Sequence, residues 1–105
     1  MNPQYKKGVL ELCVLALLTG GDRYGYELAD ALAKQIDLAD GTVYPILRKL
    51  KNDGLLTTYL QEESGGPPRK YYSLTALGRE RYEEQRAAYL RFAQSVQDIL
   101  EATKP

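Results

Sequence analysis

The sequence predicts a mainly α-helical domain that carries one small β-hairpin and ends in a long helix. Between residues 41 and 52 the apolar residues recur at three- and four-residue steps, which is typical of one face of an α-helix. Two runs rich in β-forming residues, 56–61 and 69–74, flank a polar Gly/Pro-rich turn and indicate a hairpin. Residues 76–103 contain no proline and a single glycine, as expected for a long helix.

Length and composition restrict the class of protein. One hundred and five residues fit a single small domain, whose limited core makes oligomerisation a natural supplement. The only cysteine, Cys13, cannot form an intrachain disulfide, which suits a reducing cytoplasm. The sequence has no histidine, which excludes His-based acid–base catalysis and His-ligated metal sites. We therefore expect a cytoplasmic protein with no cofactor and no metal.

The N-terminal stretch, residues 1–21, combines two lysines with an apolar run and superficially resembles a secretory signal. Glu11 interrupts the run, no small-residue cleavage site follows, and the run is too short to span a bilayer, so we expect no membrane partner. A helix that is apolar nearly all round is usually buried on both sides. One side would pack on its own domain, and the other, with Leu10 and Val14, on a partner subunit.

A second helix and a short link precede the helix at 41–52. Two glycines end the first helix, Asp22 is a reasonable N-cap, and an apolar stripe runs through residues 24–36. Residues 37–40 form a short polar turn of the length that a helix-turn-helix needs. The second helix would therefore brace the third.

The helix at 41–52 has one apolar face and one cationic, hydrogen-bonding face. Asp40 is a plausible N-cap, and Gly54 supplies a residue that tolerates positive φ past the C-terminus. Such a helix suits a DNA major groove, where base edges offer donors and acceptors; a simply solvated face is the alternative. The apolar face consists of Val43, Ile46, Leu47 and Leu50, and the opposite face of Thr42, Pro45, Arg48, Lys49 and Asn52, with Tyr44 at its border.

The hairpin and its cations complete a predicted winged helix-turn-helix. Arg69 and Lys70 lie just past the polar turn, where a wing would reach DNA phosphates. The net charge of zero speaks weakly against nucleic-acid binding and leaves an alternative, a winged-helix protein-interaction module that does not bind DNA. However, five cations gather between residues 42 and 70, and a dimer would double them on one surface. We therefore predict DNA binding with modest non-specific affinity.

The helix at 76–103, which Thr75 can cap, carries a seven-residue repeat and predicts dimerisation. A small winged helix cannot cover both this stripe and the apolar first helix, so we prefer a homodimer to packing on the helix's own domain. The predicted division is a winged helix-turn-helix DNA-binding domain at 1–75 and a C-terminal dimerisation helix at 76–105. The predicted dimer interface consists of Leu10, Val14, Tyr82, Tyr89, Phe92, Val96 and Ile99.

Four motifs extend over most of the chain: YGYEL at 24–28, GTVYPILRKL at 41–50, DGLL at 53–56 and RKYYSLT at 69–75, followed by Gly78. With these motifs at these separations the sequence resembles the PadR family of transcriptional regulators, and its single long last helix resembles the short subgroup. The resemblance implies a dimeric repressor that binds a palindromic operator and releases it when a small molecule binds. It also implies these DNA contacts: Thr42, Tyr44, Pro45, Arg48, Lys49, Lys51, Arg69 and Lys70.

Similar short members hold planar effectors in a hydrophobic pore at the dimer centre. In this sequence the walls of the pore would be Tyr5, Glu11, Leu12, Tyr89 and Phe92. Their rings would stack on a small planar aromatic or cationic compound. Some drug-binding relatives carry a tryptophan in the last helix; this chain has none, and Tyr89 is its nearest counterpart. An aromatic stripe at helical spacing is also what a plain interface core contains, so both interpretations stay open.

An enzymatic function has little support in the sequence. The candidate acid pairs, Glu62/Glu63 and Glu83/Glu84, are neighbours on polar segments without a pocket signature. We therefore predict a regulator and not an enzyme.

Overall fold

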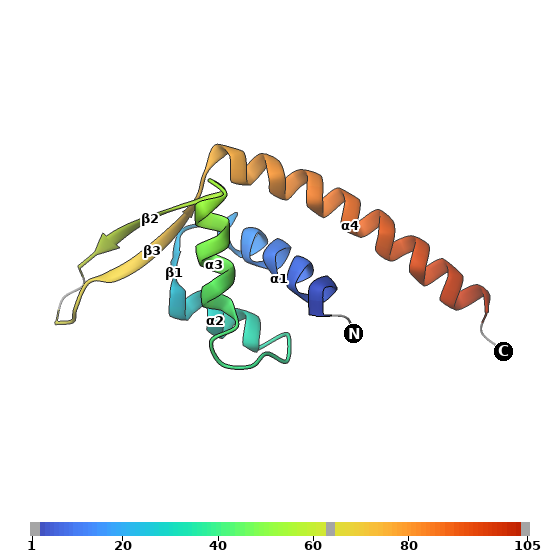
Figure 1. Cartoon of the computed structure of the whole chain (residues 1–105), viewed down its shortest axis with the longest axis horizontal. Coiled ribbons are helices and arrows are strands. Elements are labelled where there is room, and N and C mark those ends of the chain that lie inside the picture. Colours follow the sequence, from blue (N-terminus) through green and yellow to red (C-terminus); the bar gives the residue numbers. More distant parts are fainter. Residues whose placement is uncertain (1–2, 63–64, 104–105) are drawn as a thin grey trace.

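The computed structural model describes residues 3–62 and 65–103, so Glu63 of the first acid pair lies outside the described residues. Three helices and a small sheet form one body, from which a hairpin projects on one side and a long helix on the other (Figure 1). No described helix is both long and apolar enough to cross a membrane. The elements are α1 (Pro3–Leu18), β1 (Arg23–Tyr24), α2 (Gly25–Ala33), α3 (Val43–Asn52), β2 (Leu56–Gln61), β3 (Arg69–Leu74) and α4 (Ala76–Ala102).

The sheet has three antiparallel strands in the order β1–β3–β2. β2 and β3 have the bounds that the sequence predicts, and they pair along their whole length, from Leu56 opposite Leu74 outward. β1 contains only Arg23 and Tyr24 and was not predicted. It pairs with the middle of β3 and leads directly into α2.

The start of α2 differs from the prediction. The helix begins at Gly25, because the backbone amide of Tyr24 donates to the Glu27 carboxylate (3.2 Å) and so occupies the cap position. Asp22, the expected N-cap, instead accepts a hydrogen bond from the hydroxyl of Tyr59 (2.7 Å). This bond ties the loop before β1 to β2.

The link between α2 and α3, residues 34–42, is longer than predicted. Thr42 rather than Asp40 is the N-cap of α3, and its hydroxyl donates to the Ala39 carbonyl (2.8 Å). Pro45 is the third residue of the helix, where a backbone amide would have no partner within the helix. The proline therefore costs α3 no hydrogen bond.

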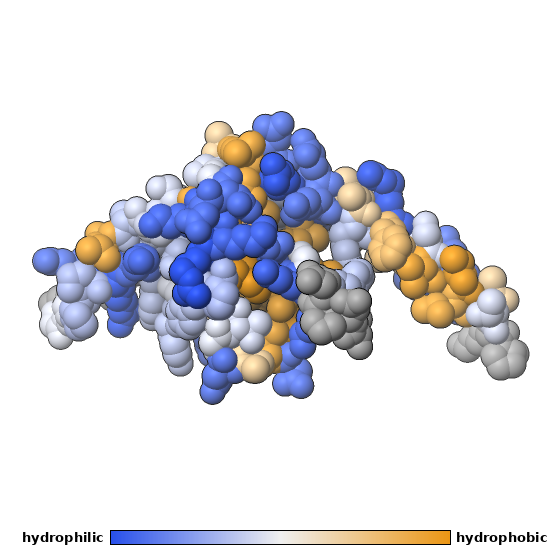
Figure 2. Space-filling model, in the orientation of Figure 1, coloured by the Kyte–Doolittle hydropathy of each residue, from blue (hydrophilic) through white to orange (hydrophobic). Residues whose placement is uncertain are grey.

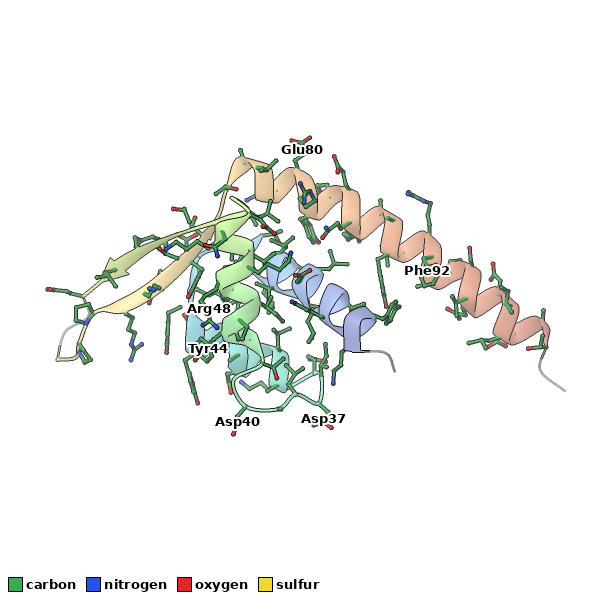
Figure 3. All side chains as sticks on the ribbon, viewed as in Figure 1. Asp37, Asp40, Tyr44, Arg48, Glu80 and Phe92 are labelled. Atoms are coloured by element: carbon green, nitrogen blue, oxygen red, sulfur yellow. The ribbon has the colours of Figure 1, made fainter. Side chains whose placement is uncertain are left out.

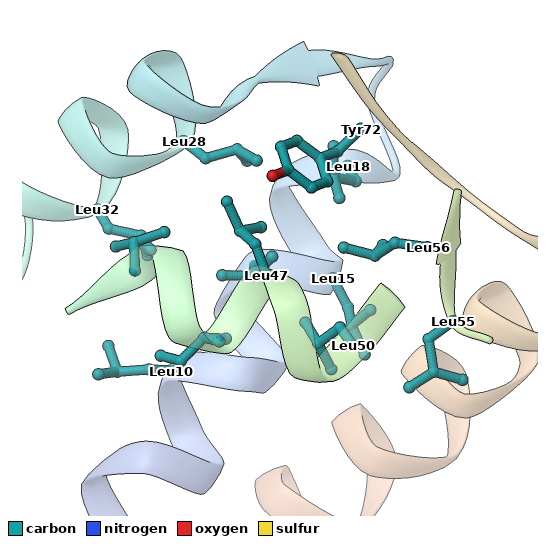
Figure 4. Packing of buried hydrophobic residues seen from close by; sticks show 13 residues of the cluster. Leu10, Leu15, Leu18, Leu28, Leu32, Leu47, Leu50, Leu55, Leu56 and Tyr72 are labelled. Carbon is teal, nitrogen blue, oxygen red and sulfur yellow. The ribbon is translucent and has the colours of Figure 1, made fainter. Parts of the chain in front are cut away.

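The hydrophobic core lies between α1, α2, α3 and the inner face of the sheet (Figure 4). The apolar face predicted for α3 is buried throughout. Leu10 and Val14 are only 3% and 0% exposed and belong to this core, so their assignment to the dimer interface is wrong. Their own domain already encloses both side chains, which leaves no surface for a partner. The core consists of Leu10, Val14, Leu15, Leu18, Leu28, Leu32, Val43, Ile46, Leu47, Leu50, Leu55, Leu56 and Tyr72.

The first turn of α4 is fixed to the residues that follow α3. Thr75 caps α4 as predicted: its hydroxyl accepts from the Gly78 amide (2.9 Å) and donates to the Gly54 carbonyl (2.7 Å). Gly54 has φ +79°, as the sequence predicts for the residue past α3. A Cβ on Gly78 would collide with the carbonyl oxygen of Leu55. This close approach sets the direction in which α4 leaves the domain.

Candidate nucleic-acid interface

The outer face of α3 is a polar surface on a helix whose other face is held in the core. Tyr44, Pro45, Arg48 and Lys51 are exposed, and Thr42 at the N-cap is half-buried. Figure 3 shows Tyr44 and Arg48 on the same side of α3. This face offers a phenol, a guanidinium and an ammonium, whose donors match the acceptors of DNA phosphates and base edges. It is therefore the candidate recognition surface.

The first turn of this surface adjoins the sheet. Tyr72 of β3 is a core residue, and burial raises the pKa of its hydroxyl. The nearby hydroxyl of Tyr44 raises the same pKa further, while the positive charge of Arg48 lowers it. Tyr44 and Arg48 of the exposed face therefore lie near Tyr72, the buried residue of β3.

Lys49 differs from its neighbours because two carboxylates already hold its ammonium. Its Nζ lies 3.0 Å from Asp53 Oδ2 and 3.1 Å from Glu11 Oε1, which joins α3 to α1. The hydrogen bond to Asp53 and then the carboxylate of Glu11 raise the pKa of Lys49. Glu11 Oε1 is buried and has no hydrogen-bond partner among the described residues, so its contact with Lys49 Nζ is an ion pair without a hydrogen bond. Lys49 therefore braces the fold, and its contact with DNA stays a prediction.

The cations of the wing lie at the tip end of β3. Arg69 and Lys70 are both exposed, and as consecutive strand residues they point to opposite faces of the sheet. The guanidinium of Arg69 lies 4.5 Å from the ring centre of Tyr24, a cation–π contact. Tyr24 starts an aromatic row across the sheet, with 5.6 Å between the ring centres of Tyr24 and Tyr71 and again between Tyr71 and Tyr59. This row was not predicted from the sequence, although the alternation of the hairpin residues could have placed Tyr59 and Tyr71 on one face.

The residues expected to bind an effector do come together, along the contact between α1 and α4. Tyr5, Glu11, Leu12 and Tyr89 line an open groove of about 330 Å³. Phe92 of α4 (Figure 3) adjoins it, because the Phe92 ring centre lies 6.5 Å from that of Tyr5. The side chain of Glu11, which also pairs with Lys49 of α3, is only 18% exposed.

The far half of α4 carries an apolar stripe that the described part of the chain leaves open to solvent (Figure 2). Phe92 is 55% exposed, Ile99 63% and Leu100 64%, and Val96 lies between them. Tyr82, nearer the start of the helix, instead packs partly against the domain's own core. The predicted interface is therefore exposed only over its C-terminal part.

Similar proteins have been described and solved. The family profile described as "Transcriptional regulator PadR-like family" matches residues 14–84. A PadR-like transcription factor from Bacteroides fragilis is 37% identical, with a TM-score of 0.77 over 91% of this chain and 94% of that one. A PadR-like transcriptional regulator from Bacillus cereus is 35% identical, with a TM-score of 0.83 over 92% and 96%. The transcriptional regulator YqjI of Escherichia coli is 35% identical over 83 residues, which make up 75% of this chain but 38% of YqjI.

The matched residues include α2, α3 and the whole sheet, which carry the candidate recognition surface and the wing. The family profile covers more than half of the chain, and the similarity to the solved relatives extends over nearly all of it. The chain therefore belongs to the PadR-like family of transcriptional regulators, which act by binding DNA and are not enzymes.

Proposed function

We propose that this chain is a homodimeric repressor that binds a palindromic operator with one α3 helix in each of two successive major grooves. The observation that carries the proposal is the asymmetry of α3. Its apolar face is buried, whereas Tyr44, Arg48 and Lys51 extend from the exposed face. A helix anchored in this way can enter a groove without any rearrangement of its own domain.

The residues of α3 have different roles in this proposal. Arg48, in the middle of the exposed face, donates to base edges or to phosphates. Thr42, Tyr44 and Pro45 approach the bases from the first turn, because the N-terminal part of a recognition helix is inserted into the groove. Lys51, at the other end, contacts a phosphate.

The wing supplies contacts outside the major groove. Arg69 and Lys70 would bind phosphates or the neighbouring minor groove, where a cation is attracted without base-specific hydrogen bonds. The contact of Arg69 with the Tyr24 ring supports this role, because it holds the guanidinium on the sheet at the start of α2.

Dimerisation would use the far half of α4, so that residues 1–75 bind DNA and 76–105 join the subunits. The exposed apolar stripe supports this role, since a second copy of the helix would remove it from water. The two α3 helices must then lie about one turn of B-form DNA apart, roughly 34 Å. Such a regulator works in the cytoplasm, where the chromosome is accessible.

We also propose that a small planar aromatic effector binds beside α4 and causes release of the operator. The groove lined by Tyr5, Glu11, Leu12 and Tyr89 supports this, as does the ring of Phe92 next to it. Aromatic rings in these positions favour a flat ligand through stacking. Because the groove adjoins the proposed dimer interface, a bound ligand would act on subunit arrangement.

The function is tested by selecting bound fragments from the host genome and measuring their affinity by fluorescence anisotropy over a range of salt. We expect Arg48→Ala to weaken operator binding by about 1–3 kcal/mol, roughly 5- to 150-fold. Arg91→Ala is the matched control, because Arg91 is exposed on α4, away from α3 and on the side opposite the apolar stripe.

The parent should lose affinity steeply as salt rises, with a slope of several per log of salt concentration. Equal affinities of the parent and of Arg48→Ala would contradict the assignment of α3. Absence of any salt-dependent binding would instead favour the protein-interaction module.

A further inference from the structure

Gly25, the first residue of α2, lies against the ring of Tyr44. A methyl group added at Gly25 would lie 3.0 Å from Cε1 of Tyr44 and 3.8 Å from Cε1 of Tyr72. The first distance is shorter than an ordinary contact between carbon atoms, which is about 3.5–4.0 Å. The Tyr44 ring therefore fits in its present place because Gly25 has no side chain.

The backbone itself does not require glycine at this position. Gly25 is not among the glycines with positive φ, and it is the first residue of a regular helix. Alanine is favoured over glycine by about 1 kcal/mol in a helix interior, because glycine loses more backbone entropy on helix formation, and at the first residue the preference has the same sign but is smaller. The reason for glycine must therefore be sought in its neighbour, and the neighbour at closest range is Tyr44.

The position of Tyr44 determines what a larger residue at Gly25 would disturb. The Tyr44 side chain is 41% exposed, so one side rests against α2 while the rest faces solvent on the recognition surface. A methyl group at Gly25 would force this ring to move by a few tenths of an ångström. Because Tyr44 is partly exposed, the ring can move toward solvent, so the fold would lose little while the phenol would be displaced from its present place.

We propose that Gly25 is a positioning residue for DNA recognition, whose lack of a side chain lets α2 hold the Tyr44 ring at a fixed place on the outer face of α3. This inference rests on the proposed function, because it assumes that α3 enters the groove. In this role Gly25 of α2 does not contact DNA itself but fixes the position of Tyr44 of α3, which does.

The experiment compares Gly25→Ala, Tyr44→Ala and the double variant in operator binding and in thermal unfolding of the full chain. We expect Gly25→Ala to weaken operator binding by roughly three- to tenfold, less than the loss of a complete base contact. Its melting temperature should equal or exceed that of the parent. The matched control is Gly20→Ala, since a methyl group at Gly20 meets nothing within 4 Å and this glycine has no positive φ. It should bind as the parent does.

The double variant separates this role from a direct one. Without the Tyr44 ring, Gly25→Ala has nothing to displace, so the double variant should bind as Tyr44→Ala does. A further loss in the double variant would overturn the inference, because it would mean that the α2 backbone itself approaches DNA. In the free protein, the ring NMR signals of Tyr44 should shift in Gly25→Ala and stay unchanged in Gly20→Ala.

The two proposals fail in different ways. If Arg48→Ala and Tyr44→Ala both leave operator affinity unchanged, the proposed function is wrong and this inference with it. If both weaken binding but Gly25→Ala does not, only the role of Gly25 is overturned.

Discussion

α3 and the far half of α4 are both amphipathic helices, but the residues that the structure describes cover the apolar surface of only one of them. The apolar residues of α3 are all buried between α1, α2 and the sheet. On α4, Phe92, Ile99 and Leu100 are more than half exposed. One subunit therefore buries the whole apolar face of α3. The far half of α4 leaves an apolar surface that we propose a second copy of the chain covers.

The largest expected effect comes from a substitution in the core that buries the apolar face of α3. Leu47 is fully buried at the centre of the core, so Leu47→Ala should lower the free energy of unfolding by about 2–5 kcal/mol. Leu100→Ala makes the same chemical change at a position exposed on one subunit, so at protein concentrations low enough to dissociate the proposed dimer it should leave the free energy of unfolding nearly unaffected. Urea unfolding followed by circular dichroism measures both. Similar losses in the two variants would mean that the far half of α4 belongs to the same folding unit.

The next largest effect is expected for a substitution in the exposed apolar stripe of α4. Ile99→Asp places a charge in the stripe and should raise the dimer dissociation constant by at least roughly a hundredfold, since an unpaired buried charge costs several kcal/mol. Ala87→Asp adds the same charge on the opposite side of α4 and serves as the control. Analytical ultracentrifugation measures the association. A dimer that survives Ile99→Asp unchanged at micromolar concentration would place the interface elsewhere.

The smallest effect concerns the brace between α1 and α3. Lys49→Met leaves Glu11 without its cation in a partly buried position and should cost about 1–2 kcal/mol of stability, a value reduced for the exposure of Lys49. Asp30→Asn breaks the exposed pair with Lys34 and should cost only a few tenths of a kcal/mol. Operator affinity should change less in Lys49→Met than in Arg48→Ala. The reverse order would support Lys49 as a DNA contact.

The pH dependence of this brace has a defined sign. Because its carboxylate neighbours raise the pKa of Lys49 above the ordinary 10.5, the folded state holds this proton more tightly than the unfolded chain. The stabilisation is therefore fully present below the ordinary pKa and is lost as the pH rises through the raised value. In Glu11→Gln the same loss should be smaller, and the alkaline titration of the Lys49 ε-carbon, followed by NMR, should move to lower pH.

The elements with a clear periodicity were predictable from the sequence. The apolar steps of α3, the alternation and turn of the hairpin and the proline-free run of α4 each depend on neighbours in the chain, so their bounds agree closely with the structure. β1 was missed because two residues carry no alternation, and their strand character comes from pairing with β3. The cap of α2 was misplaced because Asp22 is held by Tyr59, a residue distant in sequence.

The same distinction applies to the site. The exposed face of α3 follows from helical geometry, and the sequence identified Arg48 and Tyr44 on it. Two contacts depend on how α1 and α2 pack against α3, which no local sequence pattern contains. They are the ion pair of Lys49 with Glu11 and the close contact of the Tyr44 ring with Gly25. The apolar character of α1 was visible, but periodicity alone could not say that Leu10 and Val14 face their own core.

The hydrogen bond of Thr75 to Gly54 and the close approach of Gly78 to the Leu55 carbonyl hold the start of α4 against the end of the recognition helix. In the proposed dimer, each subunit would therefore rotate as a rigid body about the contact between the two α4 helices. A slight change of that crossing angle, such as a flat molecule wedged beside Tyr89 would cause, would be enlarged into a change of spacing between the two DNA-reading ends. Half-sites of fixed separation would then no longer fit.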